Sequence, residues 1–223
     1  MKIEISLIRH GLTKSNEQHR YLGKRTDEEL SEKGVKEVVL KKTMITQAYK
    51  ISPDFLFYGP MRRCIQTSEI LFDDLINNIN VEKMSVPEWT EIDFGQFEGK
   101  NYIELSGDED YQNWIDSGGT LPFPGGEDRA DFIERSYAGF VRMIDCIRKS
   151  NDVEDDAARS MAVLHGGNIM SIMYKLLGGN YYDYQVKNLE GYRILAVIPE
   201  DIPEDTSEDI SEWIKIIEVK KIK

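Results

Sequence analysis

The stretch KIEISLIRHG, residues 2–11, decides which fold this sequence can form. Its first seven residues are apolar or alternate apolar with polar, which is typical of a strand. The run ends abruptly in an arginine, a histidine and a glycine, and glycine permits a tight turn close to a ligand. We therefore predict a strand over 2–8 that delivers Arg9 and His10 to its carboxyl end.

Other short apolar runs along the chain are each followed by a segment with helical periodicity. The predicted elements are a helix over 31–49, a strand over 54–58, a helix over 60–72, a strand over 81–86, a helix over 127–149, a strand over 160–164 and a helix over 167–177. Four strand–helix units predict an α/β fold in three layers, with a mostly parallel central sheet and helices on both faces. Two last strands, 192–198 and 213–219, should add an antiparallel C-terminal edge.

The helix over 31–49 carries a start signal and an apolar pattern. Ser31 is the expected N-cap, because a serine side chain can accept a bond from a free backbone N–H of the first turn. Its expected apolar side is formed by Val35, Val38, Val39 and Ala48.

Composition restricts the class of protein. The chain has 223 residues, of which 40% are hydrophobic and 30% charged, and this suits one domain over 1–223. It contains no run of about 18 apolar residues, and no charged-then-apolar leader precedes the first strand. We therefore expect a cytoplasmic protein without a membrane segment; a homo-oligomer is compatible with the sequence.

The net charge of −12 argues against nucleic acid as a partner, but the charge is unevenly distributed. Residues 1–70 carry 13 Lys and Arg against 9 Asp and Glu, whereas the remaining residues carry 15 against 31. This asymmetry is compatible with a small anionic ligand bound by the first third of the chain, or with scatter alone.

Ligands of open parallel sheets bind beyond the carboxyl ends of the strands, so the residues that follow each strand are the candidates. If the sheet is parallel, these residues converge on one rim. They are Arg9, His10 and Gly11 after the first strand, Arg62 and Arg63 after the second, Glu88, Glu91 and Asp93 after the third, and His165, Gly166 and Gly167 after the fourth.

This set of side chains suits phosphoryl transfer. An arginine offers a fork of donors to phosphate oxygens, and a neutral histidine can act as a nucleophile. A second, protonated histidine can bind a phosphoryl oxygen, and a glutamate can transfer a proton to and from the reacting oxygens. Such chemistry depends on position and charge, so we predict neither a metal nor a cofactor. An arginine beside the first histidine would also repel a cation.

Five motifs resemble those of the histidine phosphatase superfamily, which is also called phosphoglycerate mutase-like, and they occur in the family's order. The resemblance covers about residues 3–198 and is closest to the phosphatase branch, including its small bacterial members such as alpha-ribazole phosphatase. Tyr58 and Gly59 depart from the family, in which small polar residues usually precede the proline. The motifs are LIRHGLTKSN (7–16), YLGKRTDEELSEKG (21–34), YGPMRRCIQTSEIL (58–71), WTEIDFGQFEG (89–99) and VLHGGN (163–168).

The resemblance implies a role for each candidate residue. His10 would attack phosphorus and become a phosphohistidine, while Glu91 would protonate the leaving oxygen and later activate water. The expected ligands of the phosphoryl group are Arg9, Arg63 and His165, with Asn16, Thr13, Gly23 and Gly166 as further phosphate-binding residues. Because Glu91 must be protonated to act as an acid, we expect its pKa to be raised and the pH profile to be bell-shaped.

Several alternatives remain at this point. Arg62 competes with Arg63 as the phosphate ligand, and Glu88 and Asp93 compete with Glu91 as the acid. The segment 100–126 is either a lid over the substrate or a surface excursion.

Three functions fit the motifs. The leading one is a metal-independent phosphatase acting on a small phosphorylated metabolite. The second is a cofactor-dependent phosphoglycerate mutase, which the acidic stretch 107–129, with its one arginine, disfavours. The third is a non-catalytic module that binds a phospholigand.

Overall fold

A mixed sheet organises the part of the chain that the computed structural model describes, residues 1–48, 53–73, 81–150, 157–199 and 213–223. Its six strands have the order β3-β2-β4-β1-β5-β6. In chain order they are β1 Lys2–Arg9, β2 Phe55–Tyr58, β3 Glu82–Ser85, β4 Ala158–Leu164, β5 Gly191–Val197 and β6 Lys215–Ile222.

The pairing confirms the predicted sheet. β1, β2, β3 and β4 run parallel, whereas β5 is antiparallel to both of its neighbours, β1 and β6. The expected C-terminal edge is therefore present, and the four parallel strands end on the same side. Residues 200–212, between the last two strands, lie outside the described residues.

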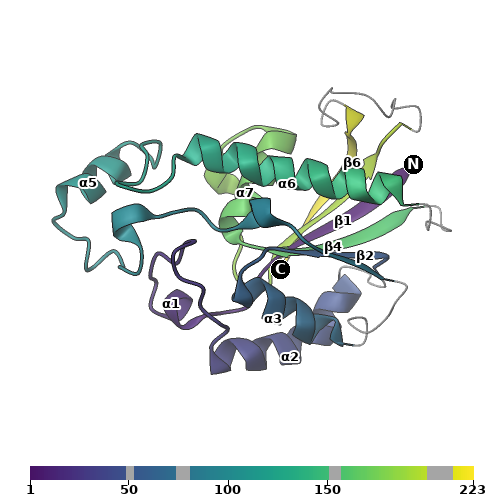
Figure 1. Ribbon diagram of the computed structural model, residues 1–223, viewed down its shortest axis with the longest axis horizontal. Helices are drawn as coiled ribbons and strands as arrows, with labels where there is room; N and C mark the ends of the chain where they lie inside the picture. Colours follow the sequence, from purple (N-terminus) through teal and green to yellow (C-terminus); the bar gives the residue numbers. More distant parts are fainter. Residues whose placement is uncertain (49–52, 74–80, 151–156, 200–212) are drawn as a thin grey trace.

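Helices cover both faces of the sheet, as predicted. Figure 1 shows α6 and α7 on one side and α2 and α3 on the other. The helices are α1 Lys14–Glu17, α2 Glu32–Ala48, α3 Arg62–Leu71, α5 Glu109–Asp116, α6 Arg129–Lys149 and α7 Gly166–Leu177, with 3-10 turns η1 Pro87–Trp89, η2 Gly95–Phe97 and η3 Tyr181–Tyr184. None of these described helices combines the length and apolar character that crossing a membrane requires.

Alternation along the strands supplies one apolar core to each helical layer. Ile5 and Leu7 of β1 belong to the core that packs against α6 and α7, through residues such as Phe140. Ile8, on the opposite face of β1, belongs to the core that packs against α2 and α3. Successive strand residues point to opposite faces, so β1 contributes to both cores.

The apolar side predicted for α2 is only partly correct. Val38 is fully buried, but Val35 is 37% and Val39 is 56% exposed; the side chain of Ala48 lies outside the described residues. Gly34 and Ile45 are also buried. Gly34 lies four residues before Val38, and Ile45 lies seven residues after it. The helix therefore touches the domain along one narrow line, and residues about 100° away from that line face solvent.

Gly34 brings α2 unusually close to the loop that follows His10. A Cβ atom at this position would lie 1.9 Å from the backbone oxygen of Leu12, which itself accepts a bond from Ser31 N. As predicted, Ser31 caps the helix, with its hydroxyl accepting a bond from Gly34 N at 3.0 Å.

We expect Gly34→Ala to destabilise the protein, against the normal preference for alanine within helices. A solvent-exposed Gly→Ala change would favour the helix by about 1 kcal/mol, whereas here the methyl group must displace backbone. The free energy of unfolding, measured in urea, should fall by about 1–3 kcal/mol. The matched control is Lys36→Ala, on the exposed side of the same helix. A more stable Gly34→Ala protein would contradict the close contact.

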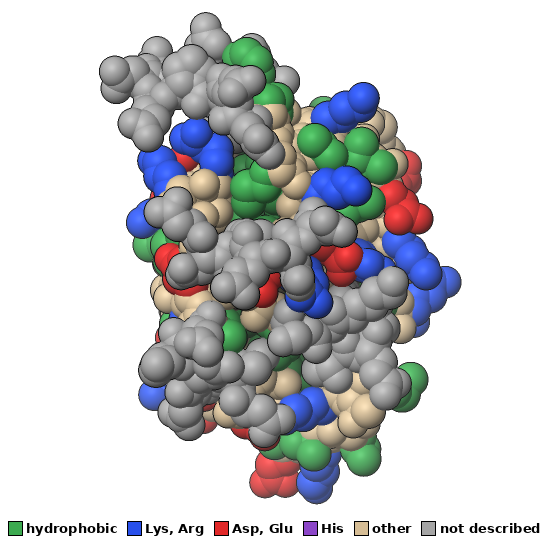
Figure 2. All heavy atoms as spheres, turned by 90° about the vertical axis from the view of Figure 1, so that its right-hand side faces the viewer, with side chains coloured by type: hydrophobic (Ala, Val, Ile, Leu, Met, Phe, Trp, Pro, Cys, Tyr) green, Lys and Arg blue, Asp and Glu red, His purple; other side chains and the backbone are tan. Residues whose placement is uncertain are grey.

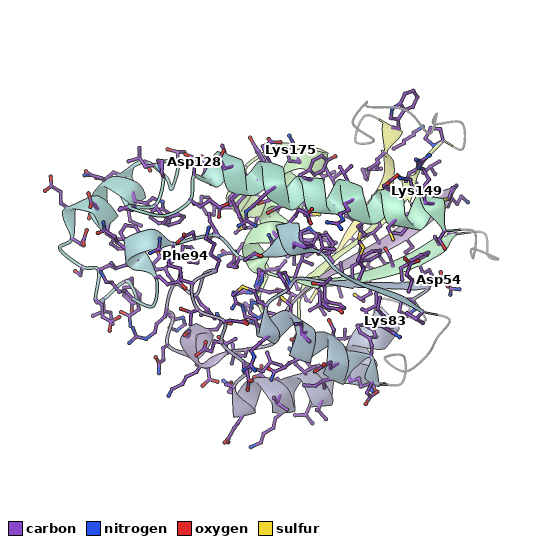
Figure 3. The ribbon with its side chains drawn as sticks, viewed as in Figure 1. Asp54, Lys83, Phe94, Asp128, Lys149 and Lys175 are labelled. Atoms are coloured by element: carbon purple, nitrogen blue, oxygen red, sulfur yellow. The ribbon has the colours of Figure 1, made fainter. Side chains whose placement is uncertain are left out.

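The two ends of the sheet differ in chemistry. Figure 3 places Phe94 and Asp128 toward the end to which β1 and β4 run, and Asp54 and Lys149 at the opposite end. Figure 2 faces that opposite end, where acidic and basic side chains are interspersed and no described histidine is visible.

Candidate active site

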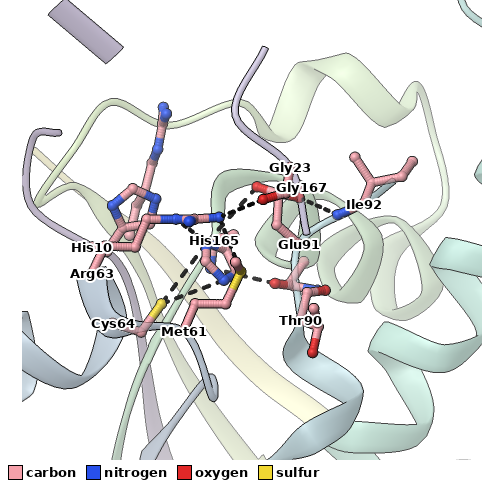
Figure 4. Close-up of polar contacts among 12 residues, drawn as sticks. His10, Gly23, Met61, Arg63, Cys64, Thr90, Glu91, Ile92, His165 and Gly167 are labelled. Carbon is pink, nitrogen blue, oxygen red and sulfur yellow. Dashed lines mark hydrogen bonds and ion pairs between the residues drawn. The ribbon is translucent and has the colours of Figure 1, made fainter. Parts of the chain in front are cut away.

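Strand pairing brings His10 and His165 together. Arg9 is in register with Leu164, so the histidines that follow them emerge side by side from neighbouring strands. The backbone N–H of His10 donates to Leu164 O at 3.0 Å, and the two imidazole rings lie 5.1 Å apart between centroids. Both histidines are buried, and the register of β1 with β4 therefore fixes the centre of the site (Figure 4).

The surroundings of His10 determine which ring nitrogen is free. Nδ1 lies 2.7 Å from Gly11 O. A carbonyl oxygen only accepts, so Nδ1 carries the proton and Nε2 of the neutral ring keeps a lone pair. The turn itself is held by two side chains, because Asn188 Nδ2 donates to His10 O at 2.9 Å and Gly11 N donates to Thr67 Oγ1 at 2.9 Å.

Of the two neighbouring arginines, only Arg63 enters the site. It is fully buried, and its Nε donates to His165 Nδ1 at 3.2 Å while Nη1 donates to Thr26 O at 3.1 Å. Because arginine never accepts, neutral His165 must carry its proton on Nε2. Arg62 is exposed and contacts Glu29 instead, since adjacent helical residues point about 100° apart.

Glu91 is the carboxylate that faces the histidines. Its Oε2 lies 3.9 Å from His165 Nδ1, and its Oε1 accepts a bond from Ile92 N at 2.9 Å. A Cβ atom on Gly167 would lie 2.7 Å from Oε1, so the glycine leaves room for the carboxylate.

The two competing carboxylates lie elsewhere. Glu88 pairs with Arg142 at 3.0 Å, and Asp93 pairs with Arg25 at 2.7 Å. Asp93 also accepts a bond from Gly95 N at 2.9 Å, so it fixes a turn.

Arg9 presents a donor without a partner. Its Nη1 donates to Val186 O at 2.9 Å, but its buried Nε has no hydrogen-bond partner within the described part of the chain. Gly166 lies against this group, since a Cβ there would be 3.3 Å from Arg9 Nε. A buried, unpaired N–H of a guanidinium is a donor that an anionic ligand would satisfy.

Burial adjusts the acid–base groups of the site. The pKa of His10 is well below its ordinary value because the ring is buried and faces Arg63 and Arg9. The pKa of His165 is also well below its ordinary value, because of burial, Arg63 and His10. Burial raises the pKa of Glu91, as the sequence predicted, despite the opposing hydrogen bond from Ile92. Neutral imidazoles beside two guanidinium groups favour an anionic ligand.

The remaining predicted residues lie around this centre in supporting positions. Thr13 caps α1, where its hydroxyl accepts a bond from Asn16 N at 3.2 Å. Asn16 Oδ1 accepts bonds from Thr13 N at 3.4 Å and from Asn188 at 3.2 Å. Gly23 O accepts a bond from Arg63 at 3.4 Å, while Gly23 N donates to Glu98 at 3.0 Å. Gly23 N is thus occupied within the protein.

Four residues of the site were not singled out in the sequence. Asn188 and Thr67 hold the turn at His10, as described above. Asn168 accepts a bond from His165 N at 3.4 Å and donates to Ser136 Oγ at 2.9 Å. Asn168 and Thr67 carried a signal, because they lie in the motifs VLHGGN and YGPMRRCIQTSEIL.

The fourth residue, Arg135, holds the segment that carries Glu91. Its guanidinium donates to the backbone oxygens of Glu88 at 2.8 Å, Thr90 at 2.6 Å and Glu91 at 3.1 Å. In the sequence Arg135 looks like a surface residue of a long helix, and nothing there indicates this role.

The departure at Gly59 has a steric reason. A Cβ atom there would lie 2.9 Å from Trp89 O and 3.6 Å from His165 Nε2.

The described residues contain no group of three or more His, Cys, Asp or Glu side chains arranged to hold a metal ion.

The histidines, arginines and glutamate of the site, together with the sheet that carries them, are typical of one class of protein. The family model of the histidine phosphatase superfamily (branch 1) matches residues 5–195, and the chain belongs to that superfamily. No curated protein sequence matches the chain significantly.

Solved structures share the fold. The alpha-ribazole phosphatase from Shigella flexneri matches with a TM-score of 0.70 and 20% identity, over 89% of this chain and 92% of that one. A mycobacterial glucosyl-3-phosphoglycerate phosphatase matches with a TM-score of 0.73 and 19% identity, over 97% of both chains. The phosphoserine phosphatase from Entamoeba histolytica, in complex with 3-phosphoglyceric acid, gives 0.66 and 22%, over 88% and 91%.

Proposed function

We propose that this protein is a metal-independent phosphatase that hydrolyses a small phosphomonoester through a phosphohistidine on His10. The observation that carries the proposal is the bond between His10 Nδ1 and Gly11 O, which leaves Nε2 unprotonated beside the guanidinium groups of Arg63 and Arg9, the first of them fully buried. Membership of the superfamily and the similarity to several phosphatases support it.

In the first step, His10 Nε2 attacks phosphorus opposite the leaving oxygen. The N–P bond forms as the P–O bond breaks, and Glu91 gives its proton to the leaving oxygen. Arg9 and Arg63 offset the charge on the phosphoryl oxygens, and we expect His165 to bind one of these oxygens.

In the second step, Glu91, now a carboxylate, takes a proton from a water molecule. The water oxygen attacks phosphorus, the N–P bond breaks and the electron pair returns to His10. Inorganic phosphate leaves and Glu91 is protonated again, so one turnover consumes one water and restores every group.

In the proposed enzyme, the segment 100–126 covers the bound substrate. It is held beside the site by an aromatic cluster, in which Trp114 and Phe123 pack against Phe97. The cluster continues to Ile92, the neighbour of Glu91. The acidic character of the segment favours a substrate with one phosphate and little further negative charge.

Release of phosphate tests the proposal directly. Sugar phosphates, nucleotides, ribazole phosphate and 4-nitrophenyl phosphate should be assayed for inorganic phosphate, and 3-phosphoglycerate for both hydrolysis and isomerisation. We expect hydrolysis of at least one monoester. Isomerisation faster than hydrolysis would identify a mutase, and binding without turnover would identify a non-catalytic module.

The pH dependence of kcat/KM should be bell-shaped, with its optimum on the acidic side of neutrality. His10 must be neutral, and its lowered pKa places the acidic limb well below the ordinary histidine range. Glu91 must be protonated, so activity should fall as pH rises through its raised pKa. The measurement is kcat/KM for an alkyl phosphate from pH 4 to 9, corrected for ionisation of the substrate. A profile that is flat from acid to neutral pH would contradict these roles.

A further inference from the structure

A cavity lies between the segment 114–120, the first turns of α6, the C-terminal half of α7 and η3. Its volume is about 810 Å³, which is within the range of small-molecule sites. None of the residues that surround the candidate phosphate site lines it. The lining residues used below are Trp114, Gly118, Arg129, Tyr174, Tyr181 and Tyr182.

Arg129 is the cation of this cavity, and no carboxylate lies within ion-pair distance of it in the described part of the chain. The three other arginines of α6 are all paired, Arg135 with Glu127, Arg142 with Glu88 and Arg148 with Asp145. The polar contact of the Arg129 guanidinium is a long one, 3.4 Å to Gly118 O. Arg129 is therefore the one arginine of α6 without an ion pair among the described residues.

Aromatic rings form the walls around this cation. The guanidinium lies 5.4 Å from the ring centre of Tyr181 and 5.8 Å from that of Tyr182, which holds it in place by cation–π contacts. Tyr174 packs against Tyr181 at 6.2 Å. Trp114 also lines the cavity, and its buried Nε1–H has no acceptor in the described residues.

The cavity is separated from the candidate active site by a thin wall. The hydroxyl of Tyr181 donates to Gly167 O at 3.3 Å. Gly167 is the residue that makes room for the Glu91 carboxylate. A ligand in the cavity would therefore lie on the far side of Tyr181 from the reacting phosphate.

We propose that this cavity is a second binding site, for a small planar organic anion such as an aromatic carboxylate. The flat body of the ligand would pack among the tyrosine and tryptophan rings, and its charged group would bind Arg129. Flat aromatic surfaces favour stacked or edge-on contact with a ring, and guanidinium groups bind carboxylates in a fork geometry. The site takes no part in the chemical steps of the phosphatase reaction proposed above, although its lining residues 114–120 belong to the segment 100–126.

Calorimetric titration of the whole protein with 2-naphthoate tests the proposal. We expect one saturable site, weaker binding of the uncharged analogue 2-naphthalenemethanol, and no displacement by inorganic phosphate. Arg129→Gln should weaken binding by about tenfold or more, because it removes a charged hydrogen bond. The matched control is Arg142→Gln, on the same helix, which should leave the affinity unchanged. His10→Ala should also keep the site, even if it abolishes turnover.

A second measurement needs no substitution. In the wild-type protein, 2-naphthoate should shift the methyl NMR signals of Ile115 and Ile133, which line the cavity. It should not shift the signal of Ile8, whose side chain lies on the face of the sheet that packs against α2 and α3. Equal affinity for the uncharged analogue, displacement by phosphate, unchanged binding to folded Arg129→Gln or unmoved methyl signals would each overturn the proposal.

Discussion

His10→Ala should reduce kcat by about 10⁴-fold or more, because loss of a covalent nucleophile leaves only binding and charge stabilisation. The wild-type protein, stopped by base during turnover of a labelled phosphomonoester, should carry phosphate on this residue, and acid treatment should remove it. A phosphoramidate bond is stable in base and labile in acid, which distinguishes it from a phosphate ester of serine or threonine. The variant should carry no label.

His19→Ala is the matched control for this experiment. His19 is exposed, and its only described role is that of a loop residue with φ of 53°. Its loss should leave kcat within about twofold of the wild-type value, as for most surface changes. Circular dichroism and thermal unfolding should show that His10→Ala is folded. A folded His10→Ala protein with near-normal turnover, or a label on another residue, would contradict the proposed reaction.

Glu91→Gln should affect substrates in proportion to how much their leaving oxygen needs a proton. For an alkyl phosphate we expect kcat to fall by about 10²–10⁴-fold, the usual contribution of a general acid. For 4-nitrophenyl phosphate, whose leaving group departs as a stabilised anion, phosphorylation of His10 should be nearly unchanged. Hydrolysis of the phosphohistidine should then be slow, because no carboxylate activates water.

Rapid-mixing measurements test this prediction. The variant should release close to one nitrophenolate per protein in a burst and then turn over slowly, with phosphohistidine accumulating. The matched control is Glu88→Gln, which removes the neighbouring carboxylate that pairs with Arg142 and should show no burst. Equal losses on both substrates, without a burst, would mean that Glu91 is not the acid.

The layers of the fold could be predicted from the sequence because the signals were local. Apolar alternation in β1, the long apolar period of α6 and the helix after His165 each depend on a few adjacent residues, and the structure has these elements close to the predicted bounds. The prediction was weaker for α2, where only Val38 of the expected valines is buried. Which face of a helix packs, and how wide the contact is, depends on residues far away in the chain, here the backbone of Leu12.

The candidate site, like the fold, could be predicted from the sequence only in part. The sequence by itself determined which chemical groups follow the strands: Arg9 and His10, the arginine pair, the acidic cluster and His165. Only the tertiary structure decided that Arg63 enters the site while Arg62 faces solvent, that Glu91 rather than Glu88 faces His165, and that Asn188 and Arg135 hold the backbone around them. The physical reason is that side-chain types are local properties of the chain, whereas direction, burial and the resulting pKa shifts arise from contacts between residues that are distant in sequence.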